Sequence, residues 1–142
     1  MELSGFPEIA TLPVQWGDQD LFEHVNNTVY FRWIETSRVE YWHKSGLHEL
    51  MEPLGLGPIL ASVKCDYKKQ LRYPDEVQIG TCVQKMGNSS VTLEHHIFSK
   101  TQNAVTAIGQ SVVVLFNYEK QHSIPIEGKI RETFASFEGK SF

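Results

Sequence analysis

The spacing of hydrophobic positions along this chain alternates between the two-residue period of strands and the longer period of helices. Alternation of Leu12, Val14 and Trp16 predicts a first strand over residues 9–17. Pro13 lacks the backbone N–H that a central strand donates to its neighbour. We therefore expect this strand to lie at an edge of its sheet or to be irregular at that point.

A long helix is predicted next, from Asn27 to about Ser45. The side chains of Asn26 and Asn27 are suited to cap its first turn, and Gly46 is suited to end it. Its inward stripe has helical spacing and consists of Tyr30, Trp33, Ile34, Ser37 and Tyr41. Further apolar residues lie off this stripe, namely Val29, Phe31, Val39 and Trp42. A helix with so broad an apolar surface is expected to be buried, so other elements must wrap around it.

Four long runs with two-residue alternation follow the helix. They cover residues 59–71, 75–86, 90–100 and 104–118, and short turn sequences such as RYPD, GNSS and TQN separate them. These links are too short for the crossover that a parallel pair needs, so we expect an antiparallel meander. The segment before the first run, HELMEPLGLGP, is expected to be a packed connecting loop, and the alternative is a partly apolar flap over a pocket.

The last part of the chain, residues 120–142, is expected to be a C-terminal extension. A loop, EKQHSIPI, precedes a short helix over residues 127–139, with Ile130, Phe134 and Phe137 on one face. We expect that face to pack on the rest of the molecule.

Together these elements predict an α+β fold in which one long antiparallel sheet wraps around a single central helix. The chain has 142 residues, of which 41% are hydrophobic and 21% charged, which is enough for a real core. No repeat or low-complexity run interrupts the pattern, so one domain over residues 1–142 is expected.

Charge and hydropathy argue against several classes of partner. A formal net charge of −4 argues against a nucleic-acid-binding surface, which needs clustered cations. No apolar run approaches the length of a membrane span, and the start of the chain has neither the basic region nor the apolar core of a secretion signal. We expect a cytoplasmic protein, with an organelle as the alternative if a targeting segment has been removed.

Cysteine and histidine spacing indicates neither a disulfide nor a metal site. Cys65 and Cys82 both fall in predicted strands, where a cysteine is usually a small buried hydrophobe rather than a nucleophile. The six histidines show no HxxxH or HxH spacing, and the adjacent His95 and His96 should point to opposite faces of a strand. We expect no metal and no redox cofactor.

The densest group of reactive polar residues lies between the first strand and the helix, in the sequence WGDQDLFEHVNN. A helix start presents unpaired N–H donors and a partial positive charge, so residues 24–27 are suited to hold a carbonyl oxygen that gains negative charge. Asp18 and Asp20 lie just before them. A carboxylate beside such donors is a hydrolase arrangement, with the aspartate as nucleophile or as base for a water. The alternative is that both aspartates merely cap the turn.

The same residues carry a resemblance to a known family. The run V-x-W-x-D-x-D, followed by H-V-N-N-x-x-Y and a helix with E-x-x-R, resembles hotdog-fold acyl thioesterases of the 4-hydroxybenzoyl-CoA thioesterase and YbgC-like group. This resemblance implies a hotdog fold with Asp20 as the catalytic carboxylate. The H-V-N-N part is also similar to plant acyl-carrier-protein thioesterases, which implies a supporting role for His24. That second pattern has Asn where this chain has Phe22, which favours a simpler scheme of Asp20 and helix-start amides. The amides expected to polarise the substrate carbonyl are those of Val25, Asn26 and Asn27.

Several other polar residues have both a structural and a functional interpretation. Glu35 and Arg38 are spaced to pair on the helix, although some hotdog thioesterases use a helix glutamate and Glu35 is the nearest candidate. Tyr30 is a core aromatic or lines the acyl pocket. A basic set follows, consisting of Lys64, Lys68, Lys69 and Arg72. We expect Lys68 and Arg72 to meet CoA phosphates or an acidic carrier-protein surface, and the alternative is a solvated strand face.

Association with a further copy is also expected. The run VVVLF within residues 104–118 is apolar on both faces, which predicts burial against something beyond the chain's own helix. The resemblance implies a homodimer with active sites at the dimer interface, and a tetramer is the alternative.

These observations predict an acyl thioesterase that hydrolyses acyl-CoA or acyl-carrier-protein thioesters to a free acid and a thiol. Two other functions stay open. A hotdog hydratase or dehydratase would need a histidine and an acid facing each other across the substrate, and His24 with Glu35 is the plausible pair. A non-catalytic acyl-CoA-binding module would leave Asp20 as a turn cap.

Overall fold

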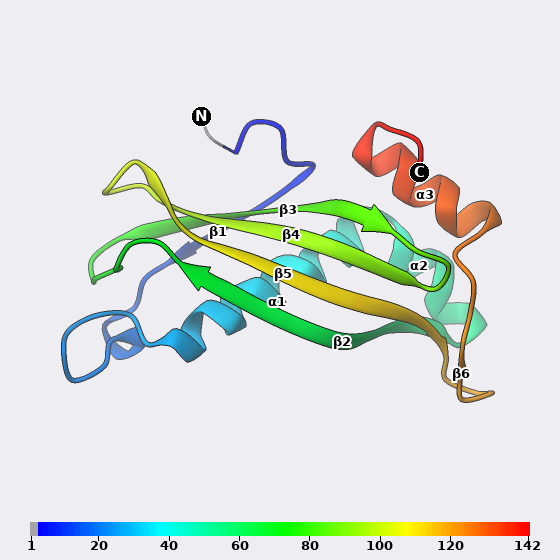
Figure 1. Cartoon of the computed structure of the whole chain (residues 1–142), viewed down its shortest axis with the longest axis horizontal. Coiled ribbons are helices and arrows are strands. Elements are labelled where there is room, and N and C mark those ends of the chain that lie inside the picture. Colours follow the sequence, from blue (N-terminus) through cyan, green and yellow to red (C-terminus); the bar gives the residue numbers. More distant parts are fainter. Residues whose placement is uncertain (1–2) are drawn as a thin grey trace.

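The computed structural model describes residues 3–142 as one antiparallel sheet that curves around a long helix (Figure 1). The strands are β1 (Glu8–Pro13), β2 (Leu56–Tyr67), β3 (Glu76–Met86), β4 (Ser90–Ser99), β5 (Ala104–Asn117) and β6 (His122–Ser123). The helices are α1 (Asn27–Lys44), α2 (Leu47–Met51) and α3 (Gly128–Glu138), with 3-10 turns at Trp16–Asp18 and Glu52–Leu54. The strand order is β1-β3-β4-β5-β2, and β6 pairs with β5. The predicted α+β hotdog architecture is confirmed.

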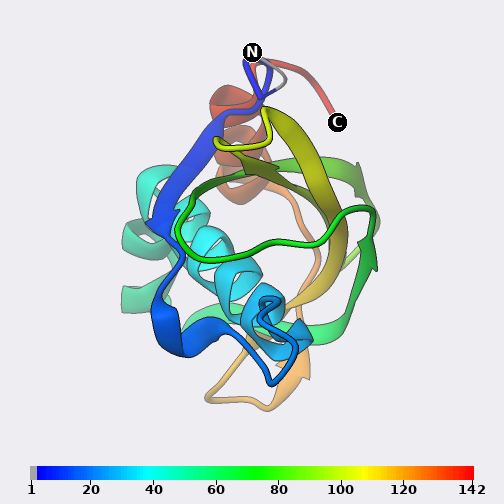
Figure 2. The same cartoon turned by 90° about the vertical axis from the view of Figure 1, so that its left-hand side faces the viewer.

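Helix α1 packs its predicted stripe against the concave face of the sheet, which Figure 2 shows curving around the helix. Every member of the stripe is at most 5% exposed: Tyr30, Trp33, Ile34, Ser37 and Tyr41. The close approach depends on Gly109 in β5, where a Cβ atom would lie 2.6 Å from Cδ1 of Ile34. A side chain at this position would have to displace the buried end of the Ile34 side chain.

The prediction that α1 is buried on nearly all sides is wrong for one face. Val39 is 49% exposed, and Glu35 beside it is also exposed. The reason is that the sheet ends at β2, which makes few contacts with the helix and leaves the face next to it uncovered. One side of α1 is therefore open in the single chain.

Two predicted strand boundaries also need correction. The first strand ends at Pro13 instead of continuing to residue 17, because the chain turns into the 3-10 helix Trp16–Asp18. It does lie at a sheet edge, as Pro13 predicted. Strand β2 begins at Leu56 and ends at Tyr67, because the amides of Lys68 and Lys69 both donate to the carbonyl of Thr106 and so break the ladder.

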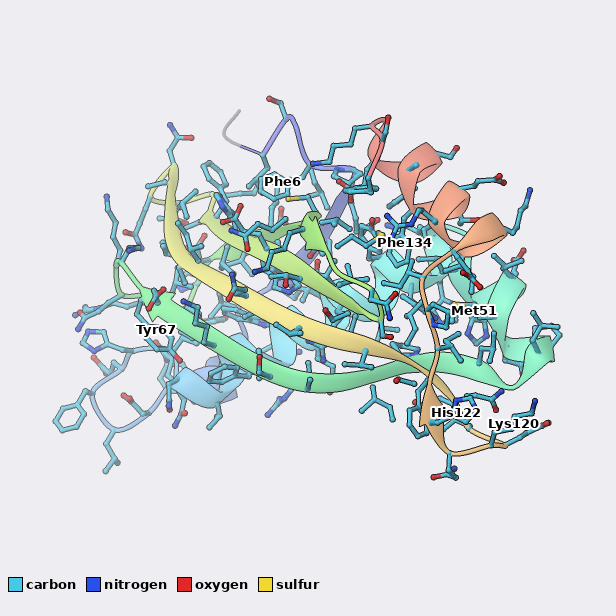
Figure 3. All side chains as sticks on the ribbon, turned by 45° about the vertical axis from the view of Figure 1, so that its right-hand side comes forward. Phe6, Met51, Tyr67, Lys120, His122 and Phe134 are labelled. Carbon is cyan, nitrogen blue, oxygen red and sulfur yellow. The ribbon has the colours of Figure 1, made fainter. Side chains whose placement is uncertain are left out.

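The connector and the C-terminal segment both pack on a second part of the core. The segment expected to be a loop begins with a short helix, α2, whose Leu47 and Met51 are fully buried, so the packed alternative holds. The predicted C-terminal helix forms as α3, and Phe134 is fully buried in the same cluster as Met51 (Figure 3). The Tyr41 hydroxyl donates to Glu138 Oε2 at 2.6 Å and ties α3 to α1.

A polar network lies buried between α1 and the sheet. His95 of β4 is fully buried, with Nδ1 2.8 Å from Thr81 Oγ1 and Nε2 2.7 Å from Ser111 Oγ. Thr81 also contacts Ser37 of α1, and Ser111 accepts a hydrogen bond from Arg38. Burial, together with the nearby charge of Arg38, lowers the pKa of His95 to about 3. His95 is therefore neutral at physiological pH.

We predict that His95 makes the protein less stable as the pH falls. An unfolded histidine has a pKa of about 6.5. Between that pH and about 3 the unfolded state binds one more proton at this position than the folded state, so the free energy of unfolding falls by about 1.4 kcal/mol per pH unit. Urea unfolding across this range should give a shallower pH dependence for His95→Gln, but not for the exposed control His122→Gln. Equal slopes for wild type and His95→Gln would contradict the assignment.

Candidate functional site

The loop before α1 is held in place by buried groups at both ends. Asp18 is buried, and its Oδ2 accepts a hydrogen bond from the backbone N–H of Gln15 at 2.8 Å. At the other end, the N–H of Asn26 donates to the carbonyl of Asp18 at 2.9 Å, and that of Val25 donates to the carbonyl of Leu71 at 2.8 Å. The loop is therefore fixed relative to the sheet, and Asp18 acts as a structural turn residue.

Asp20 lies exposed within this fixed loop. Its backbone N–H donates to the carbonyl of His24 at 2.8 Å. Its Oδ1 accepts from the N–H of Phe22 at 2.9 Å and, at 3.4 Å, from that of His24. Its Oδ2 has no hydrogen-bond partner among residues 3–142. Asp20 thus has the turn-capping contacts that were the alternative interpretation, yet keeps one carboxylate oxygen available to a substrate or water.

The first turn of α1 offers fewer free amides than the sequence suggested. Asn26 is the N-cap, and its Oδ1 accepts from the N–H of Thr28 at 2.9 Å. The N–H groups of Val25 and Asn26 are already paired with carbonyls elsewhere in the chain. Asn27 is the first helical residue, and within the described part of the chain its N–H has no partner. The expectation of three donor amides is therefore corrected to the single N–H of Asn27.

His24 and Arg72 are hydrogen-bonded to each other. The Arg72 Nη2 atom lies 3.1 Å from His24 Nε2. A guanidinium can only donate, so Nε2 of His24 must accept, and the ring proton is on Nδ1. These two residues are 48 positions apart, and no local pattern links them.

Most of the predicted site residues line one pocket of about 390 Å³. Its lining consists of Asp20, His24, Val25, Asn27, Tyr30, Tyr67, Lys68, Lys69, Gln70 and Leu71. Arg72 lies beside it in a neighbouring groove that shares Gln70. The pocket thus brings together the Asp20 carboxylate, the free amide of Asn27 and Lys68, with Arg72 next to it.

Tyr30 and Tyr67 form the aromatic wall of this pocket. Their ring centroids are 4.9 Å apart in an edge-to-face contact. Tyr30 is 3% exposed and burial raises its pKa, so its hydroxyl stays protonated. Tyr67, which sequence reasoning did not select, lies at the end of β2 (Figure 3) and donates to the carbonyl of Asn27 at 3.4 Å. The sequence feature that could have identified Tyr67 is its position near the end of a predicted strand, close to Lys68.

Glu35 and Arg38 lie elsewhere. Both line a second cavity on the open side of α1, and neither lines the pocket that holds Asp20 and His24. No salt bridge within 4.0 Å joins them, so the expected ion pair on the helix is not formed. Within one chain, His24 and Glu35 do not face each other across a common pocket.

The cysteines remain free thiols in strands β2 and β3, as predicted. Burial raises the pKa of Cys65 and of Cys82 to about 11, so both are protonated near neutral pH. Over residues 3–142, no three His, Cys, Asp or Glu side chains are grouped closely enough to hold a metal ion. In the same residues, no helix is both long enough and apolar enough to cross a membrane.

The fold, together with comparison with known proteins, defines the class of this protein as a thioester hydrolase with a hotdog fold. Residues 14–134 match the thioesterase-like superfamily, and the chain belongs to that family. The predicted resemblance and enzyme class are confirmed.

Three related proteins illustrate the match. The chain is 28% identical over 130 residues to protein YsmA of Bacillus subtilis. The matched region covers 92% of this chain and 86% of YsmA. It is 22% identical over 113 residues to the long-chain acyl-CoA thioesterase FadM of Escherichia coli, which covers 80% of this chain and 86% of FadM. A thioesterase of Thermus thermophilus complexed with coenzyme A and Zn is 28% identical, with a TM-score of 0.80 and coverage of 96% and 98%.

We predict that neither cysteine acts as a nucleophile. A pKa of about 11 leaves little thiolate at pH 8, so alkylation of the folded protein by iodoacetamide should be much slower than that of a free cysteine. The rate should rise about tenfold per pH unit until close to pH 11. The unfolded protein in urea is the control, because its thiols should react at the ordinary rate. Fast alkylation of either folded cysteine at pH 8 would contradict the prediction.

Proposed function

We propose that this protein hydrolyses acyl-CoA thioesters in the pocket at the start of α1, with Asp20 as the catalytic carboxylate. Acyl-carrier-protein thioesters are the second substrate form that the same site would accept. The observation that carries the proposal is that Asp20 and Asn27 line one pocket, the former with a free carboxylate oxygen and the latter with a free N–H. The names of FadM and of the CoA-bound Thermus thermophilus thioesterase support a CoA thioester.

The reaction follows from the chemistry of these groups. The Asn27 N–H, at the positive end of α1, donates to the thioester carbonyl oxygen as it gains negative charge. Asp20 either attacks the carbonyl carbon or takes a proton from a water that attacks it. In the first route the carbon–sulfur bond breaks to release the thiolate, and water then hydrolyses the mixed anhydride. Both routes give a free acid and a thiol, and neither needs a metal or a redox cofactor.

The remaining predicted residues bind the substrate. Lys68 is an exposed cation on the lining of the pocket, and Arg72 is an exposed cation in the groove beside it. Both are suited to bind the phosphates of CoA or an acidic carrier protein. Arg72 also fixes the tautomer of His24, so the Nδ1–H of His24 is the group left to orient substrate or water. The rival hydratase would need His24 and Glu35 on one substrate. The two residues line different cavities within one chain, and hydration of crotonyl-CoA tests the case in which a dimer brings them together.

We predict that Asp20 is essential for turnover. Asp20→Asn keeps an oxygen that can cap the turn but removes the charge, so kcat for acyl-CoA hydrolysis should fall at least about 100-fold while the protein stays folded. Free-thiol release from short, long and aromatic acyl-CoAs measures this, with Glu49→Gln on the exposed side of α2 as control. Rates that survive both Asp20→Asn and Asp20→Ala would exclude Asp20 as the catalytic group.

Ligand binding without turnover on any acyl-CoA or acyl carrier protein would instead support the non-catalytic module.

We also propose that two copies associate through β2. This strand has 12 residues and lies at the edge of the sheet, paired with β5 on one side. Exposed strand edges of this length are normally covered. Exposed apolar side chains flank it at both ends, with Leu21 and Phe22 beyond its C-terminal end and Leu54 and Tyr118 at the other. A two-fold axis through the middle of β2 places the C-terminal end of one strand beside the N-terminal end of the other. The apolar side chains at the two ends then cover each other.

The dimer gives a direct prediction. Leu60, 43% exposed on β2, should lie close to the two-fold axis, so Leu60→Asp places like charges in the interface and should yield monomers. Light scattering after size-exclusion chromatography measures the mass. Thr11→Asp, on the exposed side of the opposite edge strand β1, is the matched control and should leave the dimer intact. A wild-type monomer, or a dimer that survives Leu60→Asp, would contradict association through β2.

A further inference from the structure

The second cavity lies where the sheet leaves α1 uncovered. It has a volume of about 300 Å³ and lies between the later turns of α1 and the first half of β2. Its wall is largely apolar and includes Val39, Trp42, Leu60, Leu93 and Val113. Such a cavity is suited to a hydrocarbon group, apart from three polar side chains on its lining, Glu35, Arg38 and His43.

Arg38 is a charged group with unused hydrogen-bonding capacity. Its Nη1 donates to Ser111 Oγ at 3.1 Å, and this is the one hydrogen bond that its guanidinium makes within residues 3–142. No carboxylate of the described chain lies within 4.0 Å of it. Partial burial opposes its charge and lowers its pKa. A guanidinium has five N–H donors, so most of them remain available to a ligand.

The buried network fixes where this guanidinium lies. Arg38 can only donate, so the Ser111 hydroxyl accepts from it and in turn donates a hydrogen bond to Nε2 of His95. The Nδ1–H of His95 then donates to Thr81, which donates to Ser37. The Ser37 hydroxyl donates onward to a backbone carbonyl of β3 at 3.3 Å. Each hydroxyl and ring nitrogen in this series of hydrogen bonds therefore has a partner. The series holds the Arg38 guanidinium in place from one side.

The second cavity lies beside the first half of β2, and the thioester pocket lies at the C-terminal end of this strand. Tyr67, in the thioester pocket, and Leu60, in the second cavity, are separated by seven residues, or about 23 Å along an extended strand. When β2 pairs antiparallel with β2 of a second copy, the end of one strand lies opposite the start of the other. The C-terminal end of β2, with its thioester pocket, then lies near the first half of the partner's β2. In the proposed dimer, with the two-fold axis near the middle of β2, Pro58 on the lining of the second cavity lies opposite the partner's Cys65, two residues before the partner's Tyr67. The second cavity of one subunit therefore adjoins the thioester pocket of its partner.

We propose that the second cavity receives the far end of the acyl group, and that Arg38 selects acyl groups with an oxygen acceptor at that end. This inference rests on the proposed function. A plain alkyl end would displace water from the guanidinium without replacing its hydrogen bonds, which is costly. A hydroxyl, carbonyl or carboxylate oxygen would accept those bonds instead. Glu35 also lines the cavity, and its negative charge repels a carboxylate but not a neutral acceptor such as a hydroxyl.

The test compares acyl-CoAs of equal length that differ at the far end: octanoyl-CoA, 8-hydroxyoctanoyl-CoA and the 7-carboxyheptanoyl thioester. For wild type, kcat/KM should be at least about tenfold higher for one or both oxygenated esters than for octanoyl-CoA. Arg38→Met, which keeps the bulk of the side chain but no donors, should bring this ratio close to one. Arg38→Lys should retain part of it. Arg32→Met, the same change at an exposed position of α1, should leave the ratio as in wild type.

The outcomes separate this inference from the proposed function. Thiol release that continues with a wild-type ratio near one, or with a ratio unaffected by Arg38→Met, overturns the role of Arg38 alone. Absence of thiol release from every ester overturns the proposed function. In that case calorimetric titration with octanoate, 8-hydroxyoctanoate and octanedioate still tests the cavity. Tighter binding of an oxygenated acid that is lost in Arg38→Met supports the inference, and equal binding overturns it.

Discussion

The position of the first turn of α1 depends on two backbone hydrogen bonds that join the preceding loop to the rest of the chain. The N–H of Val25 is paired with Leu71 beyond β2, and that of Asn26 is paired with Asp18 after β1. These bonds consume two of the amides that a helix start would otherwise present, and they hold the third, on Asn27, in a fixed place beside Asp20. In the proposed mechanism this rigidity matters, because a preorganised donor stabilises developing charge without reorganising during the reaction.

A second constraint is that the sheet covers α1 incompletely. Gly109 lets the helix lie close to the centre of the sheet, and the buried network around His95 joins the two layers. Beyond β2 there is no further strand, so Val39 and the apolar edge of β2 remain exposed in the single chain. The same open side contains the second cavity. Association through β2 would therefore cover the exposed surface and join two cavities that one chain keeps apart.

Features that depend on local sequence were predicted well. The periodic stripe of α1 and the alternation of the strands follow from patterning that neighbouring residues determine. Asp20 was selected from a motif, and its catalytic role stays a prediction. Features that depend on distant partners were not accessible. The pairing of His24 with Arg72 and of Val25 with Leu71 joins segments that only the folded chain brings together. Helix α2 was missed because Pro53, Gly55 and Gly57 dominate its segment, although Leu47 and Met51 are buried before them.

The central claim is that Asp20 and the Asn27 N–H act on the same thioester carbonyl. The most direct measurement is a crystal structure of the Asp20→Asn protein with a thioester substrate trapped in the pocket. The account predicts that the carbonyl oxygen lies within hydrogen-bond distance of the Asn27 N–H, with the side chain at position 20 or a water held by it facing the carbonyl carbon. A carbonyl bound away from the start of α1, with residue 20 remote from it, would contradict the account.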